Sequence, residues 1–402
     1  MNTPGTTPID WRAVGALNAV STFAQIAQFG LGFMVLPVWL AYQGLDAPRA
    51  GIFSGAECAG MLAGLLVAPL LLARIGAKQT VLIGLALTAL AFAMMGFVGW
   101  PLWIVPGVLI GVGLGLRWIG NETWLYGLVP AESSGRIVGV HEALIATAGV
   151  VAPALAALSG VDGRITFGAG AAFTLLAALP LCVTRYDRRM HVRARVRSPL
   201  SLCVPRFEPI DGLVCLGMVV AAIGGLSDGA LYGLLPLFAA GRGLGSTQAA
   251  TLLTFLGIGA IALQFPIGWF ADRAGLASAV IVAAVLNTAA TLSFELSDAS
   301  SWQMAVSALV LGGANSAFLT LGMVAAAGSS AAGTSPGRSM RLISVSFGVG
   351  AIVGPLVAGY AMQALGSDVL MWQLALLSGS LAVYAVGVSE GRRRSGEMSS
   401  AR

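Results

Sequence analysis

The sequence predicts an all-α membrane protein of twelve transmembrane helices, arranged as two pseudo-symmetric six-helix halves. Three observations carry this prediction. Of the 402 residues, 57% are hydrophobic and only 10% are charged, whereas a soluble domain is nearer a quarter charged. Runs of about twenty apolar residues, long enough to cross a bilayer as a helix, recur along the whole chain. Short motifs of the first half return in the second half.

The twelve apolar runs are joined by polar loops, most of them short. The third and fourth runs are separated only by Gly99-Trp100-Pro101, which predicts a tight hairpin. No A-x-A cleavage site follows the first run, so we expect it to be a retained span rather than a cleaved signal peptide. The predicted spans are 13–42, 48–73, 79–99, 102–127, 137–159, 165–184, 211–240, 248–271, 276–296, 302–327, 341–364 and 368–388.

Basic residues are distributed unevenly among the predicted loops. With a cytoplasmic N-terminus, the inner loops and tails hold all but four of the 22 lysines and arginines. Positive charge gathers on the cytoplasmic side of membrane proteins. We therefore expect both termini in the cytoplasm and a bacterial-type inner (plasma) membrane location. The basic charge is assigned to topology and to contact with anionic membrane lipids, not to nucleic acid. The exceptions are Arg49, Arg164 and Arg242 in outer loops and Arg117 inside a span.

The longest polar segment divides six spans from six. It predicts an N-terminal six-helix half at 1–184, a basic cytoplasmic linker at 185–210, and a C-terminal six-helix half at 211–402 with a short cytoplasmic tail.

The two halves repeat at a shift of 199 residues. "LPVWLAYQGL" at 36–45 then falls on "LPLFAAGRGL" at 235–244, and "ARIG" at 73–76 falls on "DRAG" at 272–275. Parallel repeats of this kind build transporters whose binding site lies between the halves near the midplane.

These motifs make the chain resemble the major facilitator superfamily over nearly its whole length. "GWFADRAG" at 268–275 is similar to the family's G-x-x-x-D-R-x-G signature between spans eight and nine. The first-half copy at 69–76 departs from it, because Ala73 replaces the aspartate. The signature residues here are Gly268, Asp272, Arg273 and Gly275.

Three further stretches bear on the branch of the family. "GAIVGP" at 350–355 fits the G-x-x-x-G-P element that drug antiporters carry in span five, but here it lies in span eleven. Arg117 with Gly120 is similar to the R-x-x-x-G element of span four, with the glycine one residue early. "ETW" at 122–124 and the segment 253–273 resemble the bacterial YcaD-like branch. The resemblance implies rocking-type alternating access and a monomer.

The family signature also suggests a conformational latch. A carboxylate in a short inner loop accepts hydrogen bonds from the free N–H groups at a neighbouring helix start. In the family's fold the start of span five, just after Arg136, would face Asp272 and Arg273. We expect this contact to hold the cytoplasmic side shut. The alternative is an ordinary surface turn.

Polar residues inside spans four and five need partners, because a lone guanidinium in hydrocarbon is costly. We expect Arg117 to pair with Glu142 or Glu122, with Asn121 one turn away on the same face in support. In the functional version this pair exchanges with substrate or a proton, and in the structural version it is a static staple. His141 is interpreted as a polar interfacial residue, with a proton relay as the alternative.

Glu57 and Asp228 are the candidates for proton coupling, together with Glu142 and Glu122. Glu57 and Asp228 lie in spans two and seven, and apart from Arg49 at the outer edge of span two neither has a basic residue within its own span. A buried carboxylate without a partner can load and release a proton near neutral pH. The alternative is that each faces a water-filled vestibule and remains ionised.

The substrate cavity is expected to include Arg117 and Asn121 of span four. The family resemblance implies that spans one, four, seven and ten line this cavity. It adds the polar residues Gln25, Gln28, Tyr232 and Asn315.

The remaining motifs exclude other kinds of function. The sequence has no Walker motif, no H-E-x-x-H and no G-x-S-x-G. Two histidines and four scattered cysteines predict neither a metal site nor a cofactor. We therefore predict a proton-coupled secondary transporter for a small organic solute. The alternatives are an uncoupled facilitator of the same fold and a membrane receptor or enzyme.

Overall fold

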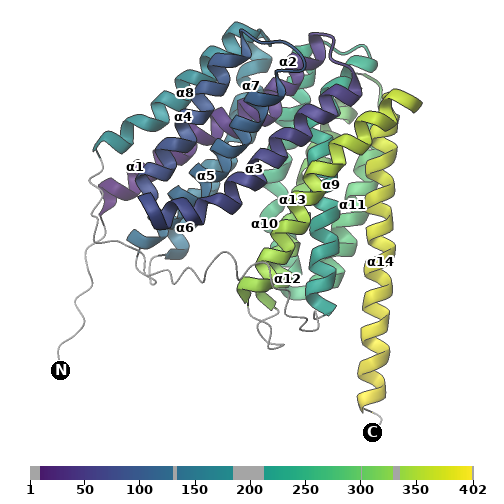
Figure 1. The fold of residues 1–402 in the computed structure, drawn as a ribbon. Coiled ribbons are helices and arrows are strands. Elements are labelled where there is room, and N and C mark those ends of the chain that lie inside the picture. The colour runs from purple at the N-terminus through teal and green to yellow at the C-terminus, as the bar shows by residue number, and fades with distance from the viewer. Residues whose placement is uncertain (1–9, 130–133, 184–211, 300, 329–335, 401–402) are drawn as a thin grey trace, which may run out of the picture. The chain divides into compact units, whose positions relative to one another are not determined.

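A computed structural model describes residues 10–129, 134–183, 212–299, 301–328 and 336–400, and the regular structure in these ranges is entirely helical (Figure 1). Twelve helical stretches within them are long and apolar enough to cross a membrane. The helices are α1 (Trp11–Gln25), η1 (Ile26–Val35), α2 (Leu36–Tyr42), α3 (Ala47–Ile75), α4 (Ala77–Met95), α5 (Ile104–Leu128), α6 (Ser134–Ala146), α7 (Ala148–Ser159), α8 (Gly163–Val183), α9 (Gly212–Gly241), α10 (Ser246–Ala274), α11 (Leu276–Leu296), α12 (Trp302–Gly328), α13 (Pro336–Leu365) and α14 (Val369–Ser400).

Eleven of the predicted spans agree with these helices to within five residues, whereas the last helix, α14, runs on to Ser400, twelve residues past the predicted end at 388. The first span is a continuous stretch of α1, η1 and α2, in which η1 is a ten-residue segment of the wider π-helix. The fifth span is formed by α6 and α7. In the third span, α4 ends at Met95 where the sequence predicted 99. Gly96 ends this helix, and the hairpin that follows is longer than predicted.

The internal repeat is visible in the backbone. Gly44 and Gly243 have φ angles of +83° and +74°, and Gly76 and Gly275 have +87° and +84°. Both pairs are separated by the 199 residues of the sequence repeat. Left-handed backbone is accessible to glycine at little cost, and it ends helices sharply. The same turn chemistry therefore closes equivalent spans of both halves.

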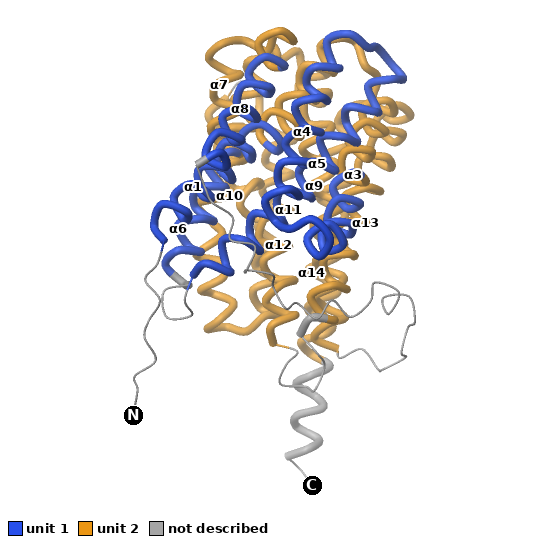
Figure 2. The backbone as a smooth tube through the Cα atoms, turned by 60° about the vertical axis from the view of Figure 1, so that its left-hand side comes forward, with its two compact units in different colours: residues 1–29, 60–148, 167–206 blue, residues 30–59, 149–166, 207–402 orange. Residues whose placement is uncertain are grey.

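Contacts group the chain into two compact units (Figure 2). Unit 1 is residues 1–29, 60–148 and 167–206. Its core forms where α4 packs along α5 and α1 packs against α5 and α6. Val81, Leu85 and Trp124 are buried in this core.

Unit 2 is residues 30–59, 149–166 and 207–402. Within it, α9 packs along α13, α10 along α12, and α11 against both α12 and α14. The contact units do not follow the two predicted sequence halves, because 30–59 and 149–166 group with the later helices. The six-helix halves therefore stay a prediction that rests on the repeat.

Glycines bring the first part of α3 against α13 within unit 2. A Cβ added at Gly51 would lie 2.2 Å from the carbonyl oxygen of Pro355, and one at Gly359 would lie 2.5 Å from that of Ala47. We call this contact the α3–α13 seam, and it comprises Gly51, Gly55, Pro355 and Gly359.

Candidate functional site

Arg117 lies at the centre of a polar cluster in unit 1. It is on α5, only 2% exposed, and its guanidinium is held by two glutamines of the first span. Nε donates to Gln28 Oε1 at 2.9 Å, and Nη2 donates to Gln25 Oε1. Gln28 in turn donates from Nε2 to Thr88 Oγ1 on α4 at 2.8 Å. The structure thus brings together three of the predicted cavity residues.

The prediction that Arg117 pairs with Glu142 or Glu122 is wrong. Among the described residues, no carboxylate lies within ion-pair distance of Arg117. Glu122 is five residues along α5, and residues five apart point to different sides of a helix. It accepts a hydrogen bond from Trp118 Nε1 instead. Glu142 is exposed on α6 and hydrogen-bonds with Tyr126.

Asn121 shares a helix face with Arg117, as predicted, but it contacts a different helix. Its Nδ2 donates to Ser21 Oγ at 2.7 Å and to the carbonyl oxygen of Leu17 at 3.1 Å. Its side chain therefore fixes α5 against α1 and forms no hydrogen bond with the side chain of Arg117. His141 is likewise buried, and its Nδ1 lies 2.8 Å from Asn18 Oδ1.

The sequence analysis named Gln25 and Gln28 as cavity residues but did not predict that they bind Arg117, and it missed Asn18 and Ser21, although the signal was present. Asn18, Ser21, Gln25 and Gln28 recur at intervals of three, four and three residues. This spacing places them along one face of a helix. A polar stripe in an otherwise apolar span predicts a face that meets other polar groups.

Asp228 anchors a second polar cluster, in unit 2. It lies on α9, is partly buried, and accepts a hydrogen bond from Asn315 Nδ2 on α12. Asn315 Oδ1 receives a hydrogen bond from Asn287 Nδ2 on α11 at 3.5 Å. Asn287 is completely buried and was missed by the sequence reasoning, although it is the one asparagine in the middle of span nine.

Glu57 lies in the same region of unit 2. It is on α3 and 1% exposed, and its Oε1 is buried with no hydrogen-bond partner in the described part of the chain. The Cys58 thiol is within electrostatic range of both Glu57 and Asp228. Tyr232, one turn beyond Asp228, is also in range of that carboxylate. Across the described ranges neither carboxylate forms an ion pair.

The predicted latch residues divide between the units. Asp272 and Arg273 lie in the last turn of α10, which Gly275 ends with a φ of +84°. The Arg273 guanidinium stacks over the Trp269 ring at 4.0 Å. Gly268 lies one turn earlier on α10. Arg136 belongs to unit 1, so the latch stays a prediction.

No group of three or more histidine, cysteine, aspartate or glutamate side chains within the described ranges could hold a metal ion. Cys58, Cys182 and Cys215 are free thiols. The fourth cysteine, Cys203, lies outside the described residues.

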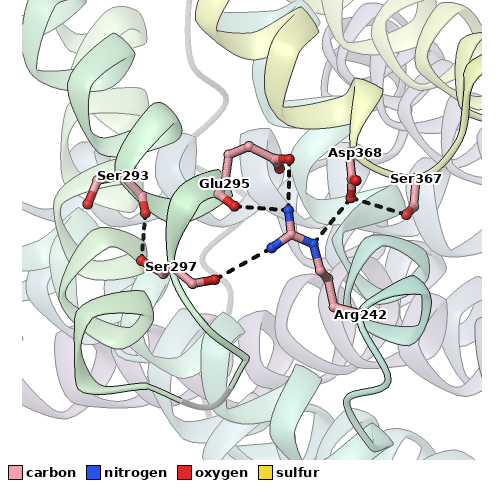
Figure 3. Close-up of polar contacts among 6 residues, drawn as sticks. All are labelled: Arg242, Ser293, Glu295, Ser297, Ser367 and Asp368. Atoms are coloured by element: carbon pink, nitrogen blue, oxygen red, sulfur yellow. Dashed lines mark hydrogen bonds and ion pairs between the residues drawn. The ribbon is translucent and has the colours of Figure 1, made fainter.

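Arg242 joins three helix ends in unit 2 (Figure 3). Its Nη2 lies 2.7 Å from Glu295 Oε1 at the end of α11, and its Nε lies 3.2 Å from Asp368 Oδ1 just before α14. The guanidinium also donates to the carbonyl oxygens of Glu295 and Ser297 and lies 5.0 Å from the Phe238 ring centre. We call this group the Arg242 clamp.

Removing the Arg242 clamp is expected to destabilise the protein measurably. Arg242→Gln leaves Glu295, whose side chain is 10% exposed, without its cation. We expect a loss of about 2 kcal/mol, below that of a fully buried pair because Asp368 is half-exposed. Thermal unfolding in detergent measures this. Arg49→Gln is the matched control, since its ion pair with Asp46 is exposed and should contribute less than about 1 kcal/mol. Equal melting temperatures for both variants would contradict the role of the clamp.

Twelve helices long and apolar enough to cross a membrane, an internal repeat and polar clusters within those helices are typical of a polytopic membrane transport protein. A family model described as Major Facilitator Superfamily matches residues 18–211 and 217–399. The chain belongs to the Major Facilitator Superfamily. It is therefore a transporter that moves a solute across a membrane, and not an enzyme.

Relatives and solved structures agree with this assignment. The chain is 24% identical over 351 residues to the uncharacterized MFS-type transporter YcaD of Escherichia coli (strain K12 / DH10B), covering 86% of this chain and 87% of YcaD. The nucleoside transporter NupG has a TM-score of 0.76 at 16% identity, with 94% and 98% of the chains covered. The D-xylose-proton symporter has a TM-score of 0.71 at 15% identity, with 93% and 96% covered. At these identities the structures support the fold.

Proposed function

We propose that the chain is a proton-coupled secondary transporter of a small organic solute. The observation that carries this proposal is the environment of Asp228. Its carboxylate is partly buried in a membrane span and is hydrogen-bonded to a neutral amide. No described lysine or arginine forms an ion pair with it. An ionisable residue inside a membrane span is by default a functional site.

The partner of Asp228 matters because it is neutral. A carboxylate in an ion pair loses its partner when it binds a proton, whereas one bound to an amide does not. Asn315 can keep its hydrogen bond to either form, since an amide both donates and accepts. Glu57 is also buried, and its Oε1 lacks a hydrogen-bond donor. This second carboxylate supports the proposal that protons bind in this region. The similarity of the fold to that of the D-xylose-proton symporter adds support by analogy.

The α3–α13 seam supports an alternating-access cycle. It joins a span of the first predicted half to a span of the second, with a backbone approach that only glycine permits. In such a contact the backbones of the two spans close one end of the transport path, and no long side chains are needed to fill the gap. We propose that the seam parts, and the Asp272 and Arg136 latch forms, as two six-helix halves rock. We place the protein in the inner membrane as a monomer, with both termini cytoplasmic.

Solute uptake into proteoliposomes under an imposed pH gradient tests the proposal. Each solute of a chemical library is offered with the gradient, without it, and with a protonophore that collapses it. We expect at least one solute to accumulate only while the gradient lasts. Uptake that equilibrates at the same level in all three conditions would instead establish the uncoupled facilitator.

A further inference from the structure

We infer that the transported solute is an organic anion and that Arg117 binds its carboxylate or phosphate group. This inference rests on the proposed function, because it names the substrate class of that transporter. Its basis is the state of the guanidinium in unit 1. Arg117 is a permanently charged group that is 2% exposed within a membrane span.

The charge of Arg117 is solvated but not compensated. Its two hydrogen-bond acceptors, Gln25 Oε1 and Gln28 Oε1, are neutral amide oxygens. The carboxylate within electrostatic range is that of Glu122, which is not at ion-pair distance and is bound to Trp118. Glu142 is likewise bound to Tyr126. A buried guanidinium is stable when a paired anion satisfies it, and the described residues of unit 1 supply none.

The guanidinium also keeps donors for a ligand. Nε and Nη2 are the atoms that bind the two glutamines, while Nη1 forms no hydrogen bond with a described residue. A planar guanidinium binds carboxylate and phosphate oxygens through parallel N–H groups.

Supporting hydrogen bonds fix the group in place. Thr88 Oγ1 donates to the carbonyl oxygen of Gly84 and accepts from Gln28 Nε2. This fixes the amide of Gln28 with its oxygen toward Arg117. The arginine is thus preorganised, which lowers the cost of ordering it on binding. A purely static staple between the first span and α5 would need the glutamine contacts and would not need an Nη1 that is left without a hydrogen-bond partner among the described residues.

The test uses the purified protein and pairs of solutes, of which one carries the anionic group and the other is its neutral counterpart. Each carboxylic acid is compared with its amide, and each phosphate monoester with its parent alcohol, at equal ionic strength. The melting temperature is recorded for wild type, Arg117→Gln, Arg117→Lys and the control Arg164→Gln, which changes an exposed arginine at the start of α8.

We expect one or more acids, and not their neutral partners, to raise the melting temperature of wild type and of Arg164→Gln in a concentration-dependent way. Arg117→Gln should weaken this response by about tenfold or more. Arg117→Lys retains the charge without the planar fork, so it should respond weakly if Arg117→Gln proves too unstable to assay. No shift with any acid, equal shifts with the neutral partners, or an undiminished response in Arg117→Gln would overturn the inference.

Proteoliposome flux separates this inference from the proposed function. If a solute stabilises the protein through Arg117 but is not transported, the anion-binding site is supported and the proposed transport function is contradicted. If a neutral solute accumulates under the pH gradient, proton-coupled transport is supported and the anion-binding role of Arg117 is contradicted.

Discussion

Asp228→Asn is expected to abolish solute accumulation driven by a pH gradient while leaving solute exchange intact. The amide has the shape of the protonated acid and keeps an oxygen that accepts from Asn315, but it cannot bind and release a proton. Coupling to one proton supports about tenfold accumulation per unit of pH gradient, because each unit supplies about 1.4 kcal/mol. The variant should reach no accumulation at all.

Two assays on the same proteoliposomes measure this effect. Net uptake against the gradient reports coupling, and exchange of labelled for unlabelled solute at equal concentrations reports binding and the conformational cycle. Asp298→Asn is the matched control, since Asp298 is exposed in the loop after α11. If Asp228 only shaped the charge of a water-filled vestibule, the variant would bind solute differently but still accumulate it. Full accumulation by Asp228→Asn would exclude Asp228 as the coupling site.

Gly51→Val is expected to open the α3–α13 seam. Any Cβ at this position would lie 2.2 Å from the carbonyl oxygen and 3.0 Å from the carbonyl carbon of Pro355. Both atoms are backbone, so neither can move aside as a side chain does, and α3 must separate from α13. Overpacking of this kind costs about 1–3 kcal/mol. A bias of that size shifts a two-state equilibrium by about 5- to 150-fold.

Cys58 supplies a native reporter of this opening. It is 6% exposed and continues the helix face of Gly51 and Gly55 one turn further along α3. In a protein whose other three cysteines are replaced by serine, Gly51→Val should increase labelling of Cys58 by a membrane-impermeant maleimide. Gly55→Ala should act more weakly, because its Cβ would lie 3.1 Å from the Ile352 oxygen.

The matched control for the seam is Gly168→Val in α8, where an added Cβ meets nothing within 4 Å. It introduces the same side chain into a helix without a close contact. Its Cys58 labelling should equal that of the parent protein. Unchanged labelling in a folded Gly51→Val protein would show that the seam is not a gate.

The helices could be predicted from the sequence because the bilayer places the same requirement on every span. Each span must be apolar and long enough to cross, so its bounds follow from hydropathy and length alone. The 199-residue repeat was readable for a similar reason, since Gly44 and Gly243 occupy turns that demand left-handed backbone. Local chemistry sufficed for both features.

The partners of Arg117 could not be predicted in the same way. Depth in the membrane suggested Glu142 and Glu122, but depth says nothing about which helix face meets which neighbour. The helix of the first span presents Gln25 and Gln28 to α5, whereas Glu122 points away from Arg117. Asn287 was missed because its relevance depends on α11 lying beside α12. Tertiary packing, and not residue type, selects these contacts.

Proton movement during solute flux tests the central claim of proton-coupled transport most directly. The pH outside weakly buffered proteoliposomes is recorded as each library solute is added, with wild type and with Asp228→Asn. We predict that at least one solute moves protons with wild type and none with the variant. Solute flux that carries no protons with wild type would contradict coupling and establish a facilitator.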